Sequence, residues 1–508
     1  MRIHFLPLYP LLLCLTACAD QIEDLTRVDD FRYNAHYAVP LIDSRVTLDE
    51  LIDETGDDFS VTVNDDGILT FTYAGDLPPL SGSDILEAAF PFSTRLDAPV
   101  EGSVSIPLTE TDGADLEEVR LGGGQLTFCV VNRLNRRVTA TFSLPTVTRN
   151  GVSIERSRVL PPWNGSGEPP KFTNLDSPID LSGYTFSAPG GTLSATTLLT
   201  TDQGQIESAG EGSAITLENV DVTFVRGRLT TSQAARTVSG RARINLFDSY
   251  RSGTLEFTDP TITLTTTSTI GLPARLDIDR LTVETVDSLR LPARGDFIRR
   301  GIAIDYPRQP GRSAISVEVI DGNNSNVDSL LGRTPAAVSL TAGAALNPTG
   351  ATVSGFISDT SSIRTRIEVD LPLAGNTEEF VFSDTLDLDL SESIESAEAL
   401  ALRITTYNSL PFSVDIGGEF LDDNGGVVAD LTQGRVLIVQ GAAEGATEPA
   451  RASQDIEIDA DVLDAVRTSR RLVLSVGITT LDDGREEIRV TPQDELQILI
   501  GAIITVDN

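Results

Sequence analysis

The sequence predicts an all-β protein made of tandem antiparallel β-sandwich domains with a few short helices. Apolar and polar residues alternate with a period of two in many segments, for example 59–63, 68–73 and 261–265. Such alternation is typical of strands with one buried face. Gly, Asn and Asp stand between these segments. Asn64-Asp65-Asp66-Gly67 has the composition of a hairpin turn, as do Asp422-Asp423-Asn424-Gly425 and Asp482-Asp483-Gly484. Frequent short strands separated by turns indicate sandwiches or barrels.

Helical signals are few and short. Thr47-Leu-Asp-Glu50 is a capping box ahead of two apolar residues, and Ser325-Asn-Val-Asp328 precedes a pair of leucines in the same way. Residues 459–469 are a third candidate. None of these segments is long enough to build a helical domain.

Three similar stretches suggest an internal repeat. Leu134, Leu272 and Leu410 each stand between two alternating segments, and a turn follows the second segment. They are evenly spaced, since 272 − 134 and 410 − 272 both equal 138. A repeat of this length indicates tandem domains, because solenoid units have about 20–50 residues. Chance alignment of strands in a β-rich chain is the alternative.

The 508 residues suit about three domains. Joints rich in Pro and Gly, together with the repeat, favour boundaries near 200 and 310–340. We expect a signal peptide at 1–17, a tether at 18–45, and sandwich domains at 46–200, 201–320 and 321–508.

The chain is strongly acidic. It has 38 Lys plus Arg against 75 Asp plus Glu, a formal net charge of −37. Such a surface repels nucleic acids and anionic lipid headgroups. We therefore expect no nucleic-acid partner.

The first eighteen residues have the features of a secretory signal. A cationic start precedes a mostly apolar stretch at 5–15, which is too short to span a bilayer. Leu15-Thr16-Ala17-Cys18 resembles the lipobox of bacterial lipoproteins. The resemblance implies cleavage before Cys18 and attachment of diacylglycerol to its thiol, which would anchor the chain in a membrane. The alternative is an ordinary secreted protein in which Cys18 has no such role.

Three further stretches resemble surface lipoproteins of Bacteroidota: 36–44, 324–331 and 408–412. This resemblance implies a β-rich protein that is lipid-anchored at the outer membrane, on its periplasmic or extracellular face. It implies no catalytic residues.

Several catalytic groups are scarce. Once the signal peptide is removed, His36 is the only histidine, so a histidine-rich zinc site within one chain is excluded. No Gly-x-Ser-x-Gly motif accompanies it, and Cys129 falls inside an alternating segment, where a buried small apolar role is expected. We therefore assign no catalytic residue. Carboxylates are abundant, so a glycan hydrolase that uses two of them is the alternative function.

The stretch 161–170 contains four prolines and the sole tryptophan, Trp163. An exposed indole can stack on a sugar ring or anchor a protein contact. Asn164 and Glu168 would then be available for sugar hydroxyls. The alternative is that Trp163 folds back and fills a gap in its own domain.

No cofactor is required, and Ca²⁺ is the one candidate. Oxygen-rich turns occur at 65–66, 321–324 and 422–424. Hairpin chemistry accounts for the same residues.

The sequence therefore predicts a non-catalytic cell-envelope lipoprotein. Its sandwich domains would serve binding, adhesion or envelope assembly. Its partners would be the membrane, through the lipid anchor, and a glycan or an envelope protein.

Overall fold

The computed structural model describes residues 35–47, 58–89, 95–108, 115–229, 233–234, 237–387, 399–432, 434–443, 448–459, 462–464 and 469–506. Antiparallel strands make up most of this part of the chain, which confirms the all-β prediction. The helical segments are short: α2 (Gly82–Ala89), η5 (Pro189–Gly191), α3 (Asp296–Arg300), α4 (Val327–Leu331) and α6 (Leu481–Gly484). None of the described helices is long and apolar enough to cross a membrane.

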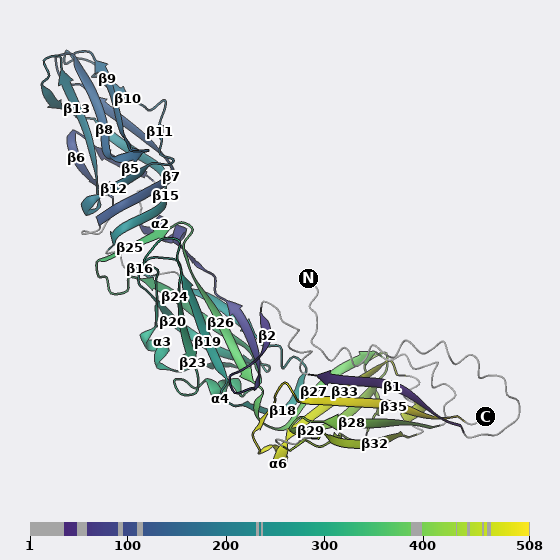
Figure 1. The fold of residues 1–508 in the computed structure, drawn as a ribbon. Helices are drawn as coiled ribbons and strands as arrows, with labels where there is room; N and C mark the ends of the chain where they lie inside the picture. The colour runs from purple at the N-terminus through teal and green to yellow at the C-terminus, as the bar shows by residue number, and fades with distance from the viewer. Residues whose placement is uncertain are drawn as a thin grey trace.

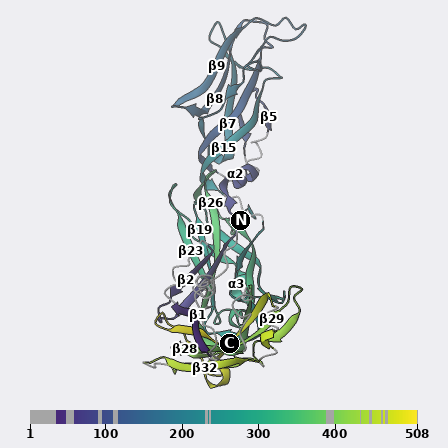
Figure 2. The same cartoon turned by 90° about the vertical axis from the view of Figure 1, so that its right-hand side faces the viewer.

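The strands form three lobes arranged in a row, with lobe 2 between lobes 1 and 3 (Figures 1 and 2). Lobe 1 contains β5 (Arg95–Pro99), β6 (Gly102–Pro107), β7 (Asp115–Val131), β8 (Val138–Arg149), β9 (Val152–Leu160), β10 (Lys171–Thr173), β11 (Ile179–Asp180), β12 (Thr185–Ala188), β13 (Thr192–Thr201), β14 (Ile206–Ser208) and β15 (Ala214–Leu229). Lobe 1 lies at the upper end of Figure 1.

Lobe 2 contains β2 (Phe59–Val63), β3 (Leu69–Asp76), β4 (Leu80–Ser81), β16 (Gln233–Ala234), β17 (Val238–Arg243), β19 (Thr261–Ser268), β20 (Ala274–Thr285), β21 (Arg290–Pro292), β22 (Ile302–Ile304), β23 (Ala314–Ile320), β24 (Pro335–Leu346) and β26 (Ser362–Pro372). Between β24 and β26, the strand β25 (Val353–Ser358) pairs with β15 and so joins lobe 2 to lobe 1.

Lobe 3 contains β1 (Ala35–Thr47), β18 (Tyr250–Phe257), β27 (Ala374–Asp387), β28 (Ala399–Asn408), β29 (Phe412–Leu421), β30 (Val427–Asp430), β31 (Val436–Val439), β32 (Ala450–Ile458), β33 (Arg471–Thr480), β34 (Ile488–Arg489) and β35 (Glu495–Val506). It lies at the end opposite lobe 1. It contains strands from both ends of the sequence, β1 in purple and β35 in yellow (Figure 1).

The three lobes share one pattern of strand pairing. In lobe 1, β7 pairs with β10 and β15, and β8 pairs with β9 and β13. In lobe 2, β19 pairs with β23 and β26, and β20 pairs with β21 and β24. In lobe 3, β28 pairs with β32 and β35, and β29 pairs with β30 and β33. Leu134, Leu272 and Leu410 occupy the connection between the first two strands of each set, so the pairing agrees with the 138-residue repeat.

The chain enters the lobes in one order and leaves them in the reverse order, so the sequence of lobe 1 lies between stretches that belong to lobes 2 and 3. The flanking strands β1, β3 and β5 pair with β35, β26 and β15, so the chain passes through lobes 3, 2 and 1 in turn. The strands β6, β17 and β27 then pair with β13, β24 and β33, which is the reverse order. The predicted limits at 200 and 320 therefore do not coincide with the sheets, because each of lobes 2 and 3 collects strands from both ends of the sequence. That each lobe is a separate domain stays a prediction.

Lobes 2 and 3 have the two-sheet arrangement of a sandwich. β19 and β20 belong to different sheets of six strands, and β28 and β29 belong to sheets of four and seven strands. Lobe 1 is a single 12-stranded sheet that includes β25. One continuous apolar core runs through lobes 1 and 2 and reaches into lobe 3 at Phe257 and Phe380; Tyr73 and Phe142 are among its largest buried side chains. Other described residues of lobe 3 form smaller clusters, around Phe420 and around Ile404.

Several local predictions are confirmed. Asn64–Gly67 joins the paired strands β2 and β3; the Gly67 N–H donates to the Asn64 carbonyl at 3.0 Å, and Gly67 has a φ of 79°. Helix α4 forms at Val327–Leu331 as predicted, although its N-cap residue is Asn326 and no side-chain hydrogen bond caps it. The candidate helix at 459–469 lies only partly within the described residues, and the one starting at Thr47 lies outside them.

One turn prediction is wrong. Asp482-Asp483-Gly484 has hairpin composition, yet it connects β33 to β34, and each of these strands pairs with β27 instead of with the other. Asp482 and Asp483 take left-handed backbone angles there, with φ of 52° and 54°. The local turn chemistry was predicted correctly, but turn composition does not determine which strands pair.

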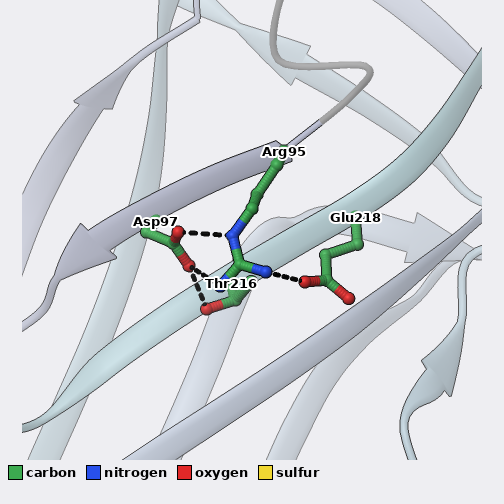
Figure 3. A network of polar contacts seen from close by, with 4 residues as sticks. All are labelled: Arg95, Asp97, Thr216 and Glu218. Atoms are coloured by element: carbon green, nitrogen blue, oxygen red, sulfur yellow. Dashed lines mark hydrogen bonds and ion pairs between the residues drawn. The ribbon is translucent and has the colours of Figure 1, made fainter.

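Ionic contacts help to hold the edge strand β5 on β15 (Figure 3). Arg95 donates from Nε to Asp97 Oδ2 at 2.6 Å and forms an ion pair with Glu218 on β15. The Thr216 hydroxyl donates to Asp97 Oδ1 at 2.6 Å. These hydrogen bonds, the one from Arg95 first, hold the pKa of Asp97 below its usual range. Arg95 and Asp97 are exposed and Thr216 and Glu218 are half-buried, so the network contributes little free energy but matches the strand register.

Candidate functional site

The proline-rich loop 161–170 is fastened to the connection between β7 and β8. The Trp163 N–H donates to the Leu134 carbonyl at 2.9 Å. Asn132, which is fully buried, donates from Nδ2 to the Pro161 carbonyl at 2.7 Å. The base of the loop is therefore fixed on lobe 1 through hydrogen bonds that the sequence alone did not indicate.

Trp163 is half-buried in this loop. The Arg133 guanidinium lies 5.6 Å from the centre of its ring, so this cation covers part of the aromatic surface. The indole Nε1 is buried and has no hydrogen-bond partner within the part of the chain that the structure describes. Stacking of Trp163 on a sugar stays a prediction.

The two polar residues predicted beside Trp163 interact within the loop. Asn164 Oδ1 accepts a hydrogen bond from the Ser166 N–H at 3.0 Å. Glu168 forms an ion pair with Lys171 and accepts a hydrogen bond from its ammonium group. This hydrogen bond lowers the pKa of Glu168. Both side chains are exposed, so a ligand could still reach them.

A larger feature of lobe 1 is an open depression of about 410 Å³. It is formed by β7, the end of β8, β9 and the segment from β10 to β12. Two cations, three aromatic rings and a carboxylate are prominent among its lining side chains: Arg149, Arg156, Phe128, Phe172, Tyr184 and Asp180. We refer to it as the arginine depression.

Arg156 occupies an unusual position on its strand. It has the same parity on β9 as Ile154 and Leu160, which are 1% and 4% exposed, so all three point toward the core side. β9 pairs only with β8 and forms an edge of the sheet, which leaves Arg156 exposed. A cation therefore stands where the alternating pattern would place an apolar residue.

Arg149 reaches the depression from the end of β8. The chain reverses into β9 through Asn150 and Gly151, whose φ angles are 52° and 77°. The Arg149 guanidinium lies 5.7 Å from the centre of the Tyr184 ring, within the range of a cation–π contact.

Contacts between aromatic rings hold Phe128 and Phe172 in place in the lining of the depression. Phe128 stacks on the buried Phe142 with ring centres 4.3 Å apart. The half-buried Phe172 meets Phe128 edge-on at 5.0 Å. These contacts fix the position of Phe172 and leave part of its ring exposed.

Neither cation of the depression forms an ion pair within the described residues, although the charge of Arg149 contributes to lowering the pKa of Asp180 in the same lining. Arg95 is paired with Asp97 and Glu218 (Figure 3), whereas neither Arg149 nor Arg156 forms an ion pair with any carboxylate of the described residues. Residues 133–184 carry seven basic and four acidic side chains, a net charge of +3 in a chain of −37. This segment of lobe 1 is therefore basic in an otherwise acidic chain, and two of its cations line the depression.

Asp180 is the carboxylate among the prominent lining groups. The Ser182 hydroxyl and N–H donate to Asp180 Oδ1 at 2.6 and 3.0 Å. These hydrogen bonds, the one from the hydroxyl first, lower the pKa of Asp180. It is therefore ionised near neutral pH and poorly suited to donate a proton as a general acid.

In two of the acidic turns proposed for Ca²⁺ an Asp side chain accepts backbone hydrogen bonds, and in the turn at 65–66 the neighbouring Asn64 does so. Asn64 Oδ1 accepts from the Ile68 N–H at 2.9 Å, and Asp422 Oδ1 accepts from the Gly426 N–H at 2.7 Å. Asp321 Oδ1 accepts from the Asn323 N–H at 3.0 Å. No group of three or more His, Cys, Asp or Glu side chains suited to a metal occurs within the described ranges. Calcium binding stays a prediction.

Two other residues singled out from the sequence lie away from the depression's lining. His36 lies in β1, opposite Thr505 of β35. Cys129 lies in β7 as expected, but it is half-buried, because Phe128 and Val130 take the core-facing positions. Burial still raises the pKa of the Cys129 thiol, which disfavours a nucleophilic role.

Sequence reasoning missed the arginine depression. Two signals could have indicated it: the local positive charge in an acidic chain, and arginine at positions 156 and 158 where alternation calls for apolar residues. Which aromatic rings meet these arginines depends on the pairing of β8 with β9 and β12, which periodicity does not reveal.

Neither a known protein-family model nor a curated protein matches the chain. Among solved structures, it is similar to a protein of Parabacteroides distasonis assigned as secreted, with 13% identity, a TM-score of 0.28, and 92% of this chain and 99% of that chain covered. It is also similar to the infectious bursal disease virus VP2 subviral particle, with 8% identity, a TM-score of 0.16, and coverage of 83% and 77%. These scores are too low to support a conclusion about function.

Proposed function

We propose that this protein is a non-catalytic lipoprotein of the outer membrane that displays lobe 1 for binding. The anchor would be the diacylglycerol on Cys18, as the lipobox resemblance implies. The binding partner would be a glycan or another envelope protein.

The position of the anchor relative to the lobes carries this proposal. Cys18 precedes Ala35, the first residue of β1, by 17 residues (35 − 18). A stretch of that length spans at most about 60 Å. β1 pairs with β35 in lobe 3, while lobe 1 lies at the opposite end of the row (Figure 1). An anchor at Cys18 would therefore hold lobe 3 near the membrane and present lobe 1 away from it.

Binding accounts for lobe 1 better than hydrolysis does. Glycoside hydrolysis generally needs two carboxyl groups about 5–10 Å apart, one of them protonated. The described lining of the arginine depression offers Asp180, whose lowered pKa keeps it ionised. Cations and partly exposed rings remain, and these groups serve recognition.

The proposal is tested by feeding cells an alkynyl fatty acid and isolating the protein. We expect the wild-type protein to carry the label and to sediment with the outer membrane. Cys18→Ser should lose both properties, whereas Cys14→Ser should keep them, because residue 14 would be removed with the signal peptide. Unchanged labelling of Cys18→Ser would overturn the proposal, as would turnover of a polysaccharide by the purified wild-type protein.

A further inference from the structure

We propose that the arginine depression binds one carboxylate-bearing sugar residue at the end of a glycan chain. Arg149 and Arg156 would hold the carboxylate, and the exposed parts of Phe172 and Tyr184 would contact the sugar ring. This inference rests on the proposed binding function of lobe 1 and assigns its ligand class.

The charge of the depression selects an anion. Arg149 and Arg156 both line it, and neither forms an ion pair with a carboxylate of the described residues. Arg149 also acts on the Asp180 carboxylate of the same lining, so the two cations outnumber one acidic group there. A guanidinium matches a carboxylate through two parallel N–H···O hydrogen bonds, which are stronger than hydrogen bonds between neutral groups. Arg403 shows this geometry elsewhere in the chain, donating to both oxygens of Asp455 at 2.7 and 2.6 Å.

The remaining lining selects a ring with an apolar face. Phe172 and Tyr184 are half-buried, and Phe172 is held in place by Phe128. Aromatic side chains of this kind combine apolar contact area with a defined orientation. The volume of about 410 Å³ falls within the range of about 300–1,000 Å³ that is usual for small-ligand sites.

The rest of the chain disfavours a polyanion. With a net charge of −37 overall, the protein repels a ligand that carries many negative charges. A single charged residue at a chain end can enter the arginine depression without bringing further charges against the acidic chain. This favours a terminal acidic sugar over an internal stretch of a polyanionic polymer.

Edge protection is the rival explanation for Arg156. Inward-facing charges on an edge strand hinder edge-to-edge pairing between molecules. Arg158 provides a matched comparison, because it is exposed on the same side of β9 and does not line the depression. A role in edge protection would apply to both arginines, whereas ligand binding would apply only to Arg156.

The experiment is calorimetric titration of the mature chain, residues 18–508 with Cys18→Ser, against the methyl glycoside of glucuronic acid. Methyl glucoside, acetate and inorganic phosphate serve as comparison ligands. We expect the uronate to bind at least tenfold more tightly than any of the three. Arg149→Gln and Arg156→Gln should each weaken its binding about tenfold, and Arg158→Gln by less than about twofold. Added salt should weaken binding of the uronate.

Three results would overturn the inference: equal binding of the uronate and the neutral glycoside, equal binding of acetate and the uronate, or equal losses for Arg156→Gln and Arg158→Gln. The third result, combined with more oligomer in both variants, would assign the arginines to edge protection. Because anchoring is measured by fatty-acid labelling, it can hold while this titration fails. The proposed display function would then stand, and only the ligand class would be wrong.

Discussion

Asn132 and Asn408 give the sharpest test of the repeated lobe structure. Both are fully buried: Asn132 begins the connection between β7 and β8, and Asn408 is the last residue of β28, directly before the connection to β29. Asn132 donates to the carbonyls of Arg136 and Pro161 at 3.2 and 2.7 Å and accepts from the Leu134 N–H at 2.9 Å. Replacing it with alanine removes all three hydrogen bonds and leaves their partners without them.

Asn408 makes the equivalent contacts in lobe 3. It donates to the carbonyls of Phe412 and Gln440 at 2.8 and 3.0 Å, and it accepts from the Leu410 N–H at 2.9 Å. Each hydrogen bond contributes about 1 kcal/mol net, so loss of three should lower the free energy of unfolding by about 3 kcal/mol. Asn132→Ala and Asn408→Ala should therefore be similar in size but act in different lobes.

Hydrogen exchange measured by mass spectrometry can locate each effect. We expect faster exchange in β7 and β8 for Asn132→Ala, and in β28 and β29 for Asn408→Ala. The control is Asn135→Ala, since Asn135 is exposed in the same connection and should change stability by less than about 0.5 kcal/mol. If Asn132→Ala behaved like Asn135→Ala, or if both buried substitutions affected the same lobe, the equivalence of the two connections would be refuted.

Three further predictions concern single side chains. If the loop 161–170 is a glycan site separate from the arginine depression, Trp163→Ala should lower affinity at that site about fivefold at unchanged melting temperature, as expected for loss of one stacked ring; a lower melting temperature with unchanged binding would show instead that the ring fills a gap in lobe 1. Cys129 should react slowly with iodoacetamide at pH 8 in the native protein and rapidly after unfolding, because burial raises its pKa; equal rates measured by mass spectrometry would contradict this. Burial also raises the pKa of Tyr73, so the folded protein holds its phenol neutral while the unfolded chain ionises it above about pH 10. This contribution to stability is complete below that pH and is lost as the pH rises further, so Tyr73→Phe should reduce the alkaline loss of stability in denaturant titrations, and identical pH profiles would disprove it.

The strands could be predicted from the sequence because the signal for a strand, the alternation of apolar and polar residues, lies within the strand itself. In β19, Ile262 and Leu264 are buried, while Thr261, Thr263 and Thr265 are only half-buried, as alternation requires. The turn at Asn64–Gly67 was predictable for the same reason, since Gly67 takes a positive φ. The 138-residue spacing also indicated the repeated connections between strands.

Long-range pairing could not be predicted in this way. β1 pairs with β35, and β3 pairs with β26. The composition of a strand does not indicate which other strand it pairs with. The predicted domains are continuous stretches of sequence, and they therefore do not match lobes 2 and 3, whose strands come from separate stretches. The arginine depression was missed for a related reason: Arg149 and Tyr184 come together only because β12 pairs with β8.

Display of lobe 1 away from the membrane is the central claim, and energy transfer to lipid measures it most directly. The lipidated protein, carrying Cys129→Ala, is labelled with a fluorophore at one introduced cysteine and bound to vesicles that contain acceptor lipids. Ser157→Cys places the label on exposed β9 of lobe 1, and Asn424→Cys places it on the exposed turn between β29 and β30 of lobe 3. We predict efficient transfer from position 424 and little from position 157. Equal transfer from both positions, or more from position 157, would contradict the account.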